Sequence, residues 1–183
     1  MKNWKVILIA VAGVIAVILM CVFGVQSSQN KAISYEESVE TAKSDIDTQL
    51  KRRVNVFSEL ADCVKQYDKH EYDTIKDAIS QRGSNMTESE ADNVTAQINA
   101  VAEAYPKLAS QKNYKTLMNE ISVTENLIAQ YKQAYNKSIE KYNRYIKKFP
   151  TRIFLGWTGY EKQEYKRYET DATDNEPLEL FGD

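Results

Sequence analysis

The pattern of apolar and polar residues divides the chain into two unequal parts. Residues 6–25 are apolar without interruption, and they are preceded by Lys2 and Lys5 and followed by polar residues 26–28. As a helix, twenty residues rise about 30 Å, the thickness of the hydrocarbon core of a bilayer. A helix also satisfies its backbone polar groups internally, as lipid requires. The pattern therefore predicts a transmembrane helix over residues 6–25.

Two other interpretations of this apolar run are less consistent with its residues. A cleaved secretory signal has a shorter apolar region and a small-x-small cleavage site, which residues 26–28 match only loosely. A lipoprotein signal places a small residue before its acylated cysteine, whereas Cys21 follows the bulky Met20. We therefore interpret the run as a permanent single-pass anchor in the cell membrane.

The charges that flank the span indicate its orientation. Lys2 and Lys5 lie before it, whereas Lys31 and Lys43 behind it are interspersed with acidic residues of segment 36–45. Basic flanks prefer the cytoplasm, so we expect the amino-terminal end inside and the large domain on the extracytoplasmic side. The difference in charge between the two flanks is small, so a cytoplasmic location of the large domain is the alternative.

Beyond the span, apolar residues recur every three or four positions, which is typical of amphipathic helices. The first such stripe runs from Ile33 to Ile79. It predicts one long helix that ends at Arg82, where Gly83 can adopt the conformation that terminates helices.

A second helix is predicted after this glycine. Thr87 and Glu90 have the spacing of a capping box, in which each side chain binds the backbone N–H of the other residue. The helix is expected to end before Tyr105 and Pro106, because proline disfavours helical geometry in the residue that precedes it.

A third helix is predicted to begin between residues 110 and 115 and to run to Phe149, where Pro150 ends it. The charged segment 161–169 favours one further helix. Residues 170–183 are acidic and rich in turn-forming types, so we expect disorder there.

These helices predict an all-α fold, because each one has a single apolar face that must be buried against another. The expected architecture is an amino-terminal transmembrane helix followed by an antiparallel bundle of three to four long helices. The predicted boundaries are a flank at 1–5, the anchor at 6–25, the bundle at 26–169 and the acidic tail at 170–183.

Composition limits the classes of partner. Once Lys2 and Lys5 are assigned to the anchor segment, 22 of the 24 basic residues remain against 26 acidic ones, a net charge of −4. This balance argues against binding nucleic acid, or anionic lipid, by net attraction. The only cysteines are Cys21 in the span and Cys63, so no disulfide within the soluble domain is expected.

Several short motifs follow one another in an order that resembles the signature of the LemA family. They are QLKRR at 49–53, VKQY at 64–67, His70 with Glu71, YPKL at 105–108, TENLIA at 124–129, Tyr135 with Asn136, Tyr142 with Asn143, Phe149 with Pro150, and Gly159 with Tyr160. The resemblance covers about residues 35–168. It implies a short amino terminus, one membrane span and a helical bundle, with a role in envelope stress or quality control.

One departure from that pattern lies directly after the paired arginines. The family usually has Asp-Leu-x-Pro-Asn-Leu there, whereas this chain has NVFSEL at 55–60. The missing proline removes an expected kink, so a straighter first helix is predicted.

The residue types that support catalysis are sparse. Cys63 and the single histidine, His70, are seven residues apart, about 10.5 Å along a helix, which exceeds hydrogen-bonding reach. We interpret Cys63 as a small packed residue and His70 as a polar boundary residue near a helix end. No metal, cofactor or catalytic residue is predicted.

The paired arginines, Arg52 and Arg53, form the sharpest motif. They either lie on a solvated face, with one of them binding Glu125 or Glu120 across the bundle, or they present a guanidinium fork to a carboxylate or phosphate of a partner. The sequence favours the structural interpretation and leaves the partner-binding one open.

Other candidate residues lie on the third helix and just after it. Glu125 and Asn126 are polar residues on the apolar stripe, where such residues set the register of a bundle. Tyr135 and Tyr142 share one face of the helix, where they are either core residues or part of a surface that binds a partner helix. Trp157 either caps the bundle or contacts the membrane interface. Pro106 and Pro150 are structural residues that mark helix boundaries.

Three functions remain in consideration. The first is a membrane-anchored scaffold of the bacterial cell envelope that binds protein partners, some of them membrane-bound, without catalysis of its own. The second is a structural envelope protein that self-associates through its tyrosines. The third is a metal-dependent hydrolase that uses His70 and carboxylates.

Overall fold

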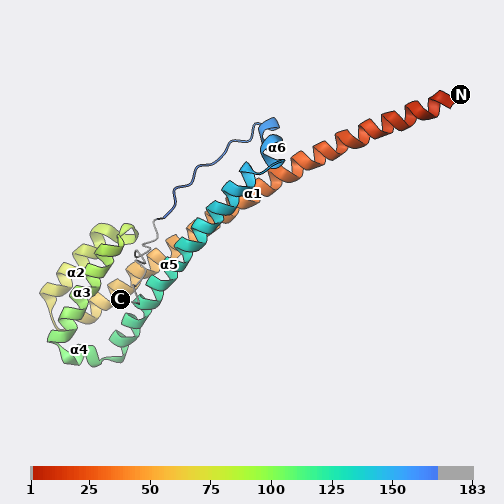
Figure 1. The fold of residues 1–183 in the computed structure, drawn as a ribbon. Coiled ribbons are helices and arrows are strands. Elements are labelled where there is room, and N and C mark those ends of the chain that lie inside the picture. The colour runs from red at the N-terminus through yellow and green to blue at the C-terminus, as the bar shows by residue number, and fades with distance from the viewer. Residues whose placement is uncertain (1, 169–183) are drawn as a thin grey trace, which may run out of the picture. The chain divides into compact units, whose positions relative to one another are not determined.

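The structure is a computed structural model that describes residues 2–168, and every regular element in that range is helical (Figure 1). This confirms the predicted all-α class. The elements are α1 (Lys2–Val64), α2 (Lys69–Arg82), the 3-10 turn η1 (Gly83–Asn85), α3 (Glu88–Ala104), α4 (Pro106–Ser110), α5 (Lys112–Lys147) and α6 (Thr151–Trp157). The predicted tail at 170–183 lies outside the described residues.

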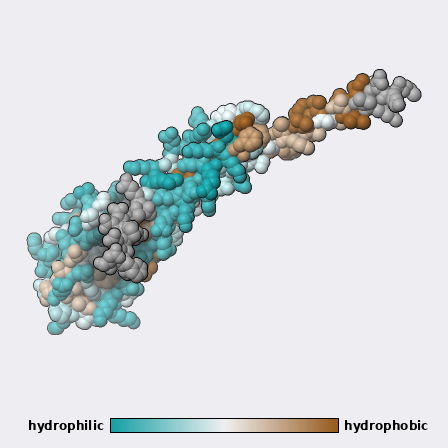
Figure 2. Space-filling model, viewed as in Figure 1, coloured by the Kyte–Doolittle hydropathy of each residue, from teal (hydrophilic) through white to brown (hydrophobic). Residues whose placement is uncertain are grey.

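The amino-terminal part of α1 has the properties of a membrane span. Its large apolar side chains from Ile7 to Phe23 are exposed on all sides, and within residues 2–168 this is the one helix long and apolar enough to cross a bilayer. Figure 2 shows it as a continuous apolar segment. The helix continues without a break from the apolar run into the polar part of the chain.

The prediction of one helix from 33 to 79 is wrong, because α1 ends at Val64 and α2 begins at Lys69. Asp68 has an extended backbone, and its carboxylate accepts the N–H of Glu71 at 3.1 Å. This is an N-cap, a signal that the sequence contained and that the apolar periodicity concealed. Lys76 of α2 then donates to the carbonyl of Ser58, so α2 folds back beside the end of α1.

The other predicted helix boundaries agree closely with the structure. Thr87 and Glu90 form the expected capping box, and α3 ends at Ala104, before Pro106. α5 begins at Lys112 as expected but ends at Lys147, two residues before Phe149, and the Phe149–Pro150 peptide bond is cis. Gly83 ends α2 with a φ of 51°, a conformation that glycine adopts without strain.

The described chain forms two compact units. The arginine unit consists of residues 43–133, and the tyrosine unit consists of residues 2–42 and 134–168. In the arginine unit, α1 and α5 are antiparallel, because Arg53 pairs with Glu125 whereas Cys63, further along α1, contacts Asn113, which lies earlier on α5. Its core includes Phe57, Leu60, Val64, Ile75, Ile98, Leu108 and Ile121.

The tyrosine unit has the same antiparallel arrangement. Tyr145 donates to the carbonyl of Ser28, and Tyr142, one turn earlier on α5, donates to Glu36, which lies further along α1. Its buried residues include Ala32, Val39, Ala42, Tyr135, Ile139, Tyr142, Ile146 and Leu155. Long antiparallel helices are therefore present in both units, as the apolar stripes predicted.

Residues 160–168 are extended, so the helix predicted for 161–169 is wrong over its described part. The backbone of this segment binds side chains of α5 instead of forming helical hydrogen bonds. Asn136 donates to the carbonyl of Tyr168 at 2.8 Å and accepts the N–H of Tyr168 at 3.1 Å. Gln163 donates its N–H to the hydroxyl of Tyr142 at 2.9 Å.

Asn136→Ala is expected to release the end of this segment, because it removes both hydrogen bonds to the backbone of Tyr168, at about 0.5–1.5 kcal/mol each. Hydrogen exchange of the full chain in detergent should show loss of protection at amides near residue 168. Asn143 lies two turns further along α5, and within residues 2–168 its side chain makes no hydrogen bond, so Asn143→Ala is the matched control. Equal exchange in both variants would contradict this account.

Candidate partner-binding surfaces

Arg53 is the most deeply buried charged residue in the described chain, with 2% of its surface exposed. It comes from α1, and its Nη2 donates to the carbonyl of Met86, directly after η1. Its Nη1 lies 3.4 Å from Oε1 and 3.5 Å from Oε2 of Glu125 on α5. One guanidinium therefore connects three segments of the arginine unit.

Arg52 has a different environment, although it is the adjacent residue. Its side chain is 57% exposed, and its Nη2 lies 2.7 Å from Oε1 of Glu120 on α5. The sequence predicted that one of the two arginines binds Glu125 or Glu120, and in the structure each arginine pairs with one of these glutamates. A partner-binding role for Arg52 and Arg53 stays a prediction, and Arg53 has no exposed surface to offer.

The carboxyl of Glu125 is affected mainly by its burial. Burial raises the pKa of Glu125, and the nearby guanidinium of Arg53 opposes that rise through its charge and hydrogen bond. The contacts to Arg53 are long for charge-assisted hydrogen bonds, which explains why burial outweighs the attraction. This pair is therefore a positioning contact rather than a strong source of stability.

The polar stripe residues of α5 lie in different environments. Thr124 is buried, at 1% exposed, whereas Asn126 is exposed and donates to the carbonyl of Ser122 on its own helix. Thr124 Oγ1, Gln49 Oε1 and Arg53 Nε are buried without a hydrogen-bond partner among the described residues. These uncompensated polar atoms belong to the seam between α1 and α5, where a shift in register would change which of them are buried.

The tyrosine unit contains a cluster of hydroxyl groups around one carboxylate. Tyr142 and Tyr160 both donate to Oε1 of Glu36, and their own hydroxyls lie 3.2 Å apart. Burial and the hydrogen bond to Glu36 raise the pKa of Tyr160. Burial, followed by the charges of Glu36 and Glu40, raises the pKa of Tyr165 to about 12. The phenol of Tyr160 therefore stays protonated and donates its hydrogen bond to Glu36.

The predicted row of Tyr135 and Tyr142 lies inside the tyrosine unit, where both residues are buried. Segment 160–168 covers the row. The ring centroids of Tyr168 and Tyr135 are 5.3 Å apart, and those of Tyr165 and Tyr142 are 5.5 Å apart. The tyrosine surface that was considered as a binding site for a partner helix is thus covered by the chain's own segment 160–168.

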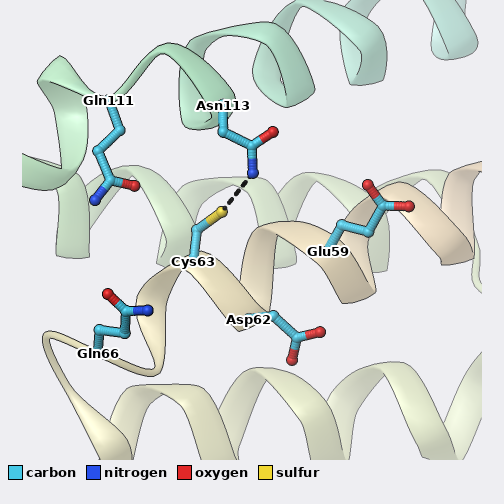
Figure 3. A pocket seen from close by; sticks show the side chains of 6 residues that line it. All are labelled: Glu59, Asp62, Cys63, Gln66, Gln111 and Asn113. Atoms are coloured by element: carbon cyan, nitrogen blue, oxygen red, sulfur yellow. Dashed lines mark hydrogen bonds between the residues drawn. The ribbon is translucent and has the colours of Figure 1, made fainter.

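A polar cleft of about 330 Å³ opens between the end of α1 and the start of α5 (Figure 3). It is lined by Glu59, Asp62, Cys63, Gln66, Gln111 and Asn113. The amino-acid sequence carries no local signal for this cleft, because its two sides are about fifty residues apart in the chain and their residue types are ordinary on helix surfaces.

Cys63 lies at the centre of this cleft in Figure 3, where Asn113 donates to its sulfur at 3.5 Å. Burial, more than the nearby carboxylates, raises the pKa of the Cys63 thiol, and Asn113 opposes the rise. Because the thiolate is the nucleophile, this environment disfavours the reactive form of Cys63. Its contacts with the core agree with its interpretation as a packed residue.

A second, smaller groove of about 200 Å³ lies between α2 and α3. Arg82 and Glu90 pair across it at 3.0 Å, beside Met86 and Val94. This ion pair connects the two helices on either side of the groove.

The remaining predicted residues are not among those that line the cleft. His70 is exposed at the start of α2, as expected for a residue near a helix end, and Trp157 is 67% exposed at the end of α6. Pro106 is the first residue of α4, and Pro150 directly precedes α6. Among residues 2–168, no group of three or more His, Cys, Asp or Glu residues is placed to hold a metal ion.

Comparison with known proteins gives one family match and a set of partial relatives. The model of the LemA family matches residues 42–179. Magnetosome protein MamQ 2 of Paramagnetospirillum magneticum is 33% identical over 73 residues, which make up 40% of this chain and 27% of that protein. Magnetosome protein MamQ of Magnetospirillum gryphiswaldense is 32% identical over 73 residues, with the same coverage. The chain thus spans about a quarter of the length of the relatives it matches.

Arg53→Ala is expected to lower the free energy of unfolding by about 2–4 kcal/mol, because the Met86 carbonyl and Glu125 lose a buried partner. Arg52→Ala is the matched control and should cost less than about 1 kcal/mol, since its ion pair is exposed. Urea unfolding of the full chain in detergent, followed by circular dichroism, measures both. Equal losses in the two variants would show that Arg53 has no special role in connecting the segments.

Proposed function

The chain belongs to the LemA family, and from this premise we propose that it is a membrane-anchored helical interaction module of the bacterial cell envelope, without catalytic activity of its own. The observation behind the proposal is the continuity of α1, which contains both the apolar run and the first helix of each unit. Any partner in the same membrane is then confined near the bundle, so weak contacts suffice for binding.

The environments of the reactive groups favour binding over catalysis. The Cys63 thiol and the phenols of Tyr160 and Tyr165 have raised pKa values, so these three groups stay protonated near neutral pH. Arg53 is engaged with Glu125 inside the core. A nucleophile or general base requires the opposite shift, toward an ionised or basic form at working pH.

The polar cleft is the surface that we assign to a protein partner. Two carboxylates, Glu59 and Asp62, line it together with the amide groups of Gln66, Gln111 and Asn113. Asp62 Oδ1 also lies 3.3 Å from Nζ of Lys76 on α2, so a cationic partner group would share this carboxylate with Lys76. Such a lining suits a lysine or arginine side chain of a partner segment, with the amides binding its neighbouring backbone. The partial likeness to MamQ proteins supports kinship of the shared segment and does not assign this chain to a magnetosome.

The cleft is tested by in-cell photo-crosslinking from a benzophenone amino acid placed at Gln66. We expect a reproducible crosslinked partner whose yield falls about tenfold in the double variant Glu59→Gln with Asp62→Asn, because charge-assisted hydrogen bonds are lost. Asp73→Asn with Asp77→Asn, two exposed carboxylates of α2, is the matched control. An unchanged yield would exclude the cleft, a crosslink to a second copy would favour self-association, and no reproducible crosslink would contradict the scaffold function.

We also propose that the helical domain lies on the extracytoplasmic side, because Lys2 and Lys5 precede the span and acidic residues follow it. An alkaline phosphatase domain fused after residue 183 should then be active, since this enzyme requires an oxidising compartment for its disulfides. A cytoplasmic reporter that is active in the same position would reverse the assignment.

A further inference from the structure

α6 lies directly beside the end of the apolar run of α1 (Figure 1). The ring of Phe154 on α6 approaches Gly24 so closely that a Cβ added to this glycine would lie 3.3 Å from the ring. Gly24 is the penultimate residue of the apolar run 6–25. Therefore, if α1 crosses a bilayer with that run, α6 lies at the level where hydrocarbon meets the headgroups.

The residues around α6 expose large apolar side chains at this level. Phe149 is 71% exposed, Trp157 is 67% exposed, and Ile153 is 39% exposed. Trp157 also contacts the ring of Phe154, at 5.8 Å between centroids, so it belongs to the same cluster. Adjacent exposed apolar residues of this size mark interaction sites, and tryptophan in particular prefers the membrane interface.

The charge around α6 is also segregated from that of the rest of the domain. Residues 141–160 include five basic residues and no acidic ones, and residues 1–35 contain no acidic residue either. The five are Lys141, Arg144, Lys147, Lys148 and Arg152. The net charge of −4 for the whole domain conceals this basic region, which would attract the anionic surface of a bilayer.

We propose that residues 147–157 form a second membrane contact, which docks on the surface of the bilayer that α1 crosses. Phe149 and Trp157 enter the interface at headgroup level, and Lys147, Lys148 and Arg152 bind the phosphates of anionic phospholipids. The contact rests on the anchoring of α1 but does not depend on the binding of a protein partner. A single span is able to rotate about its axis, and this second contact fixes which face of the tyrosine unit meets the lipid.

The test uses the full chain with Trp4→Phe, which leaves Trp157 as the only tryptophan. The protein is reconstituted in phosphatidylcholine vesicles that contain phosphatidylglycerol, and resistance to carbonate extraction is measured first. We expect Trp157 emission at shorter wavelength than in unfolded protein, quenching by lipids brominated near the headgroup end of the acyl chain, and protection from aqueous acrylamide.

Two triple variants separate charge from general surface effects. Lys147→Gln, Lys148→Gln and Arg152→Gln should reduce the quenching of Trp157 by brominated lipid and abolish its dependence on phosphatidylglycerol. Lys107→Gln, Lys112→Gln and Lys115→Gln remove three exposed basic residues of the arginine unit and should leave the quenching unchanged. Equal effects of the two triple variants would overturn the assignment of the charges to lipid binding.

Two further outcomes test the second membrane contact. If the protein resists carbonate but Trp157 is quenched by acrylamide and not by brominated lipid, α6 does not contact the bilayer, and the interaction module is unaffected. If carbonate releases the protein from the vesicles, the anchoring of α1 fails and the second contact fails with it. Crosslinking to a partner through the cleft is measured separately, so loss of one proposal is distinguishable from loss of the other.

Discussion

The helix α1 has one part suited to hydrocarbon and one part suited to water, and the packing of the rest of the described chain follows from this difference. Up to residue 25 its side chains are apolar in every direction, which hydrocarbon tolerates and water does not. Beyond that point only one face is apolar, with Ala32, Val39, Ala42 and Ile46 buried. Because one exposed stripe of this length is unfavourable in water, α5 must cover it, and the antiparallel pairing seen in each unit follows.

The two units bury polar groups within these seams in different ways. In the arginine unit, the guanidinium of Arg53 is enclosed and lies 3.4 Å from the carboxylate of Glu125, so the pair specifies position at a cost in desolvation. In the tyrosine unit, Glu36 accepts hydrogen bonds from the hydroxyl groups of Tyr142 and Tyr160. Both arrangements connect segments that are far apart in the chain.

The distribution of charge gives the molecule different surfaces for different partners. Carboxylates and amides line the cleft at the end of α1, whereas the residues around α6 are basic and aromatic. The polar cleft thus has the chemistry to bind a cationic protein segment, and the region around α6 has the chemistry to bind an anionic lipid surface. Average charge is a poor guide to partners in such a chain, because attraction acts locally over about a Debye length.

The sequence alone determined the span, the all-α class and most helix ends, because hydrophobic periodicity, caps and prolines act over a few residues. For the paired arginines it indicated only that one of them could bind Glu120 or Glu125, whereas the structure pairs both. Hydrophobic periodicity did not reveal the break between Val64 and Lys69, because apolar residues recur at similar spacing across it, although Asp68 is the N-cap of α2. The tertiary structure alone decided that 160–168 is extended, because its backbone partners, Asn136 and Tyr142, lie on another element. It alone placed Phe154 against Gly24 and assembled the polar cleft, because contacts between residues distant in sequence leave no local pattern.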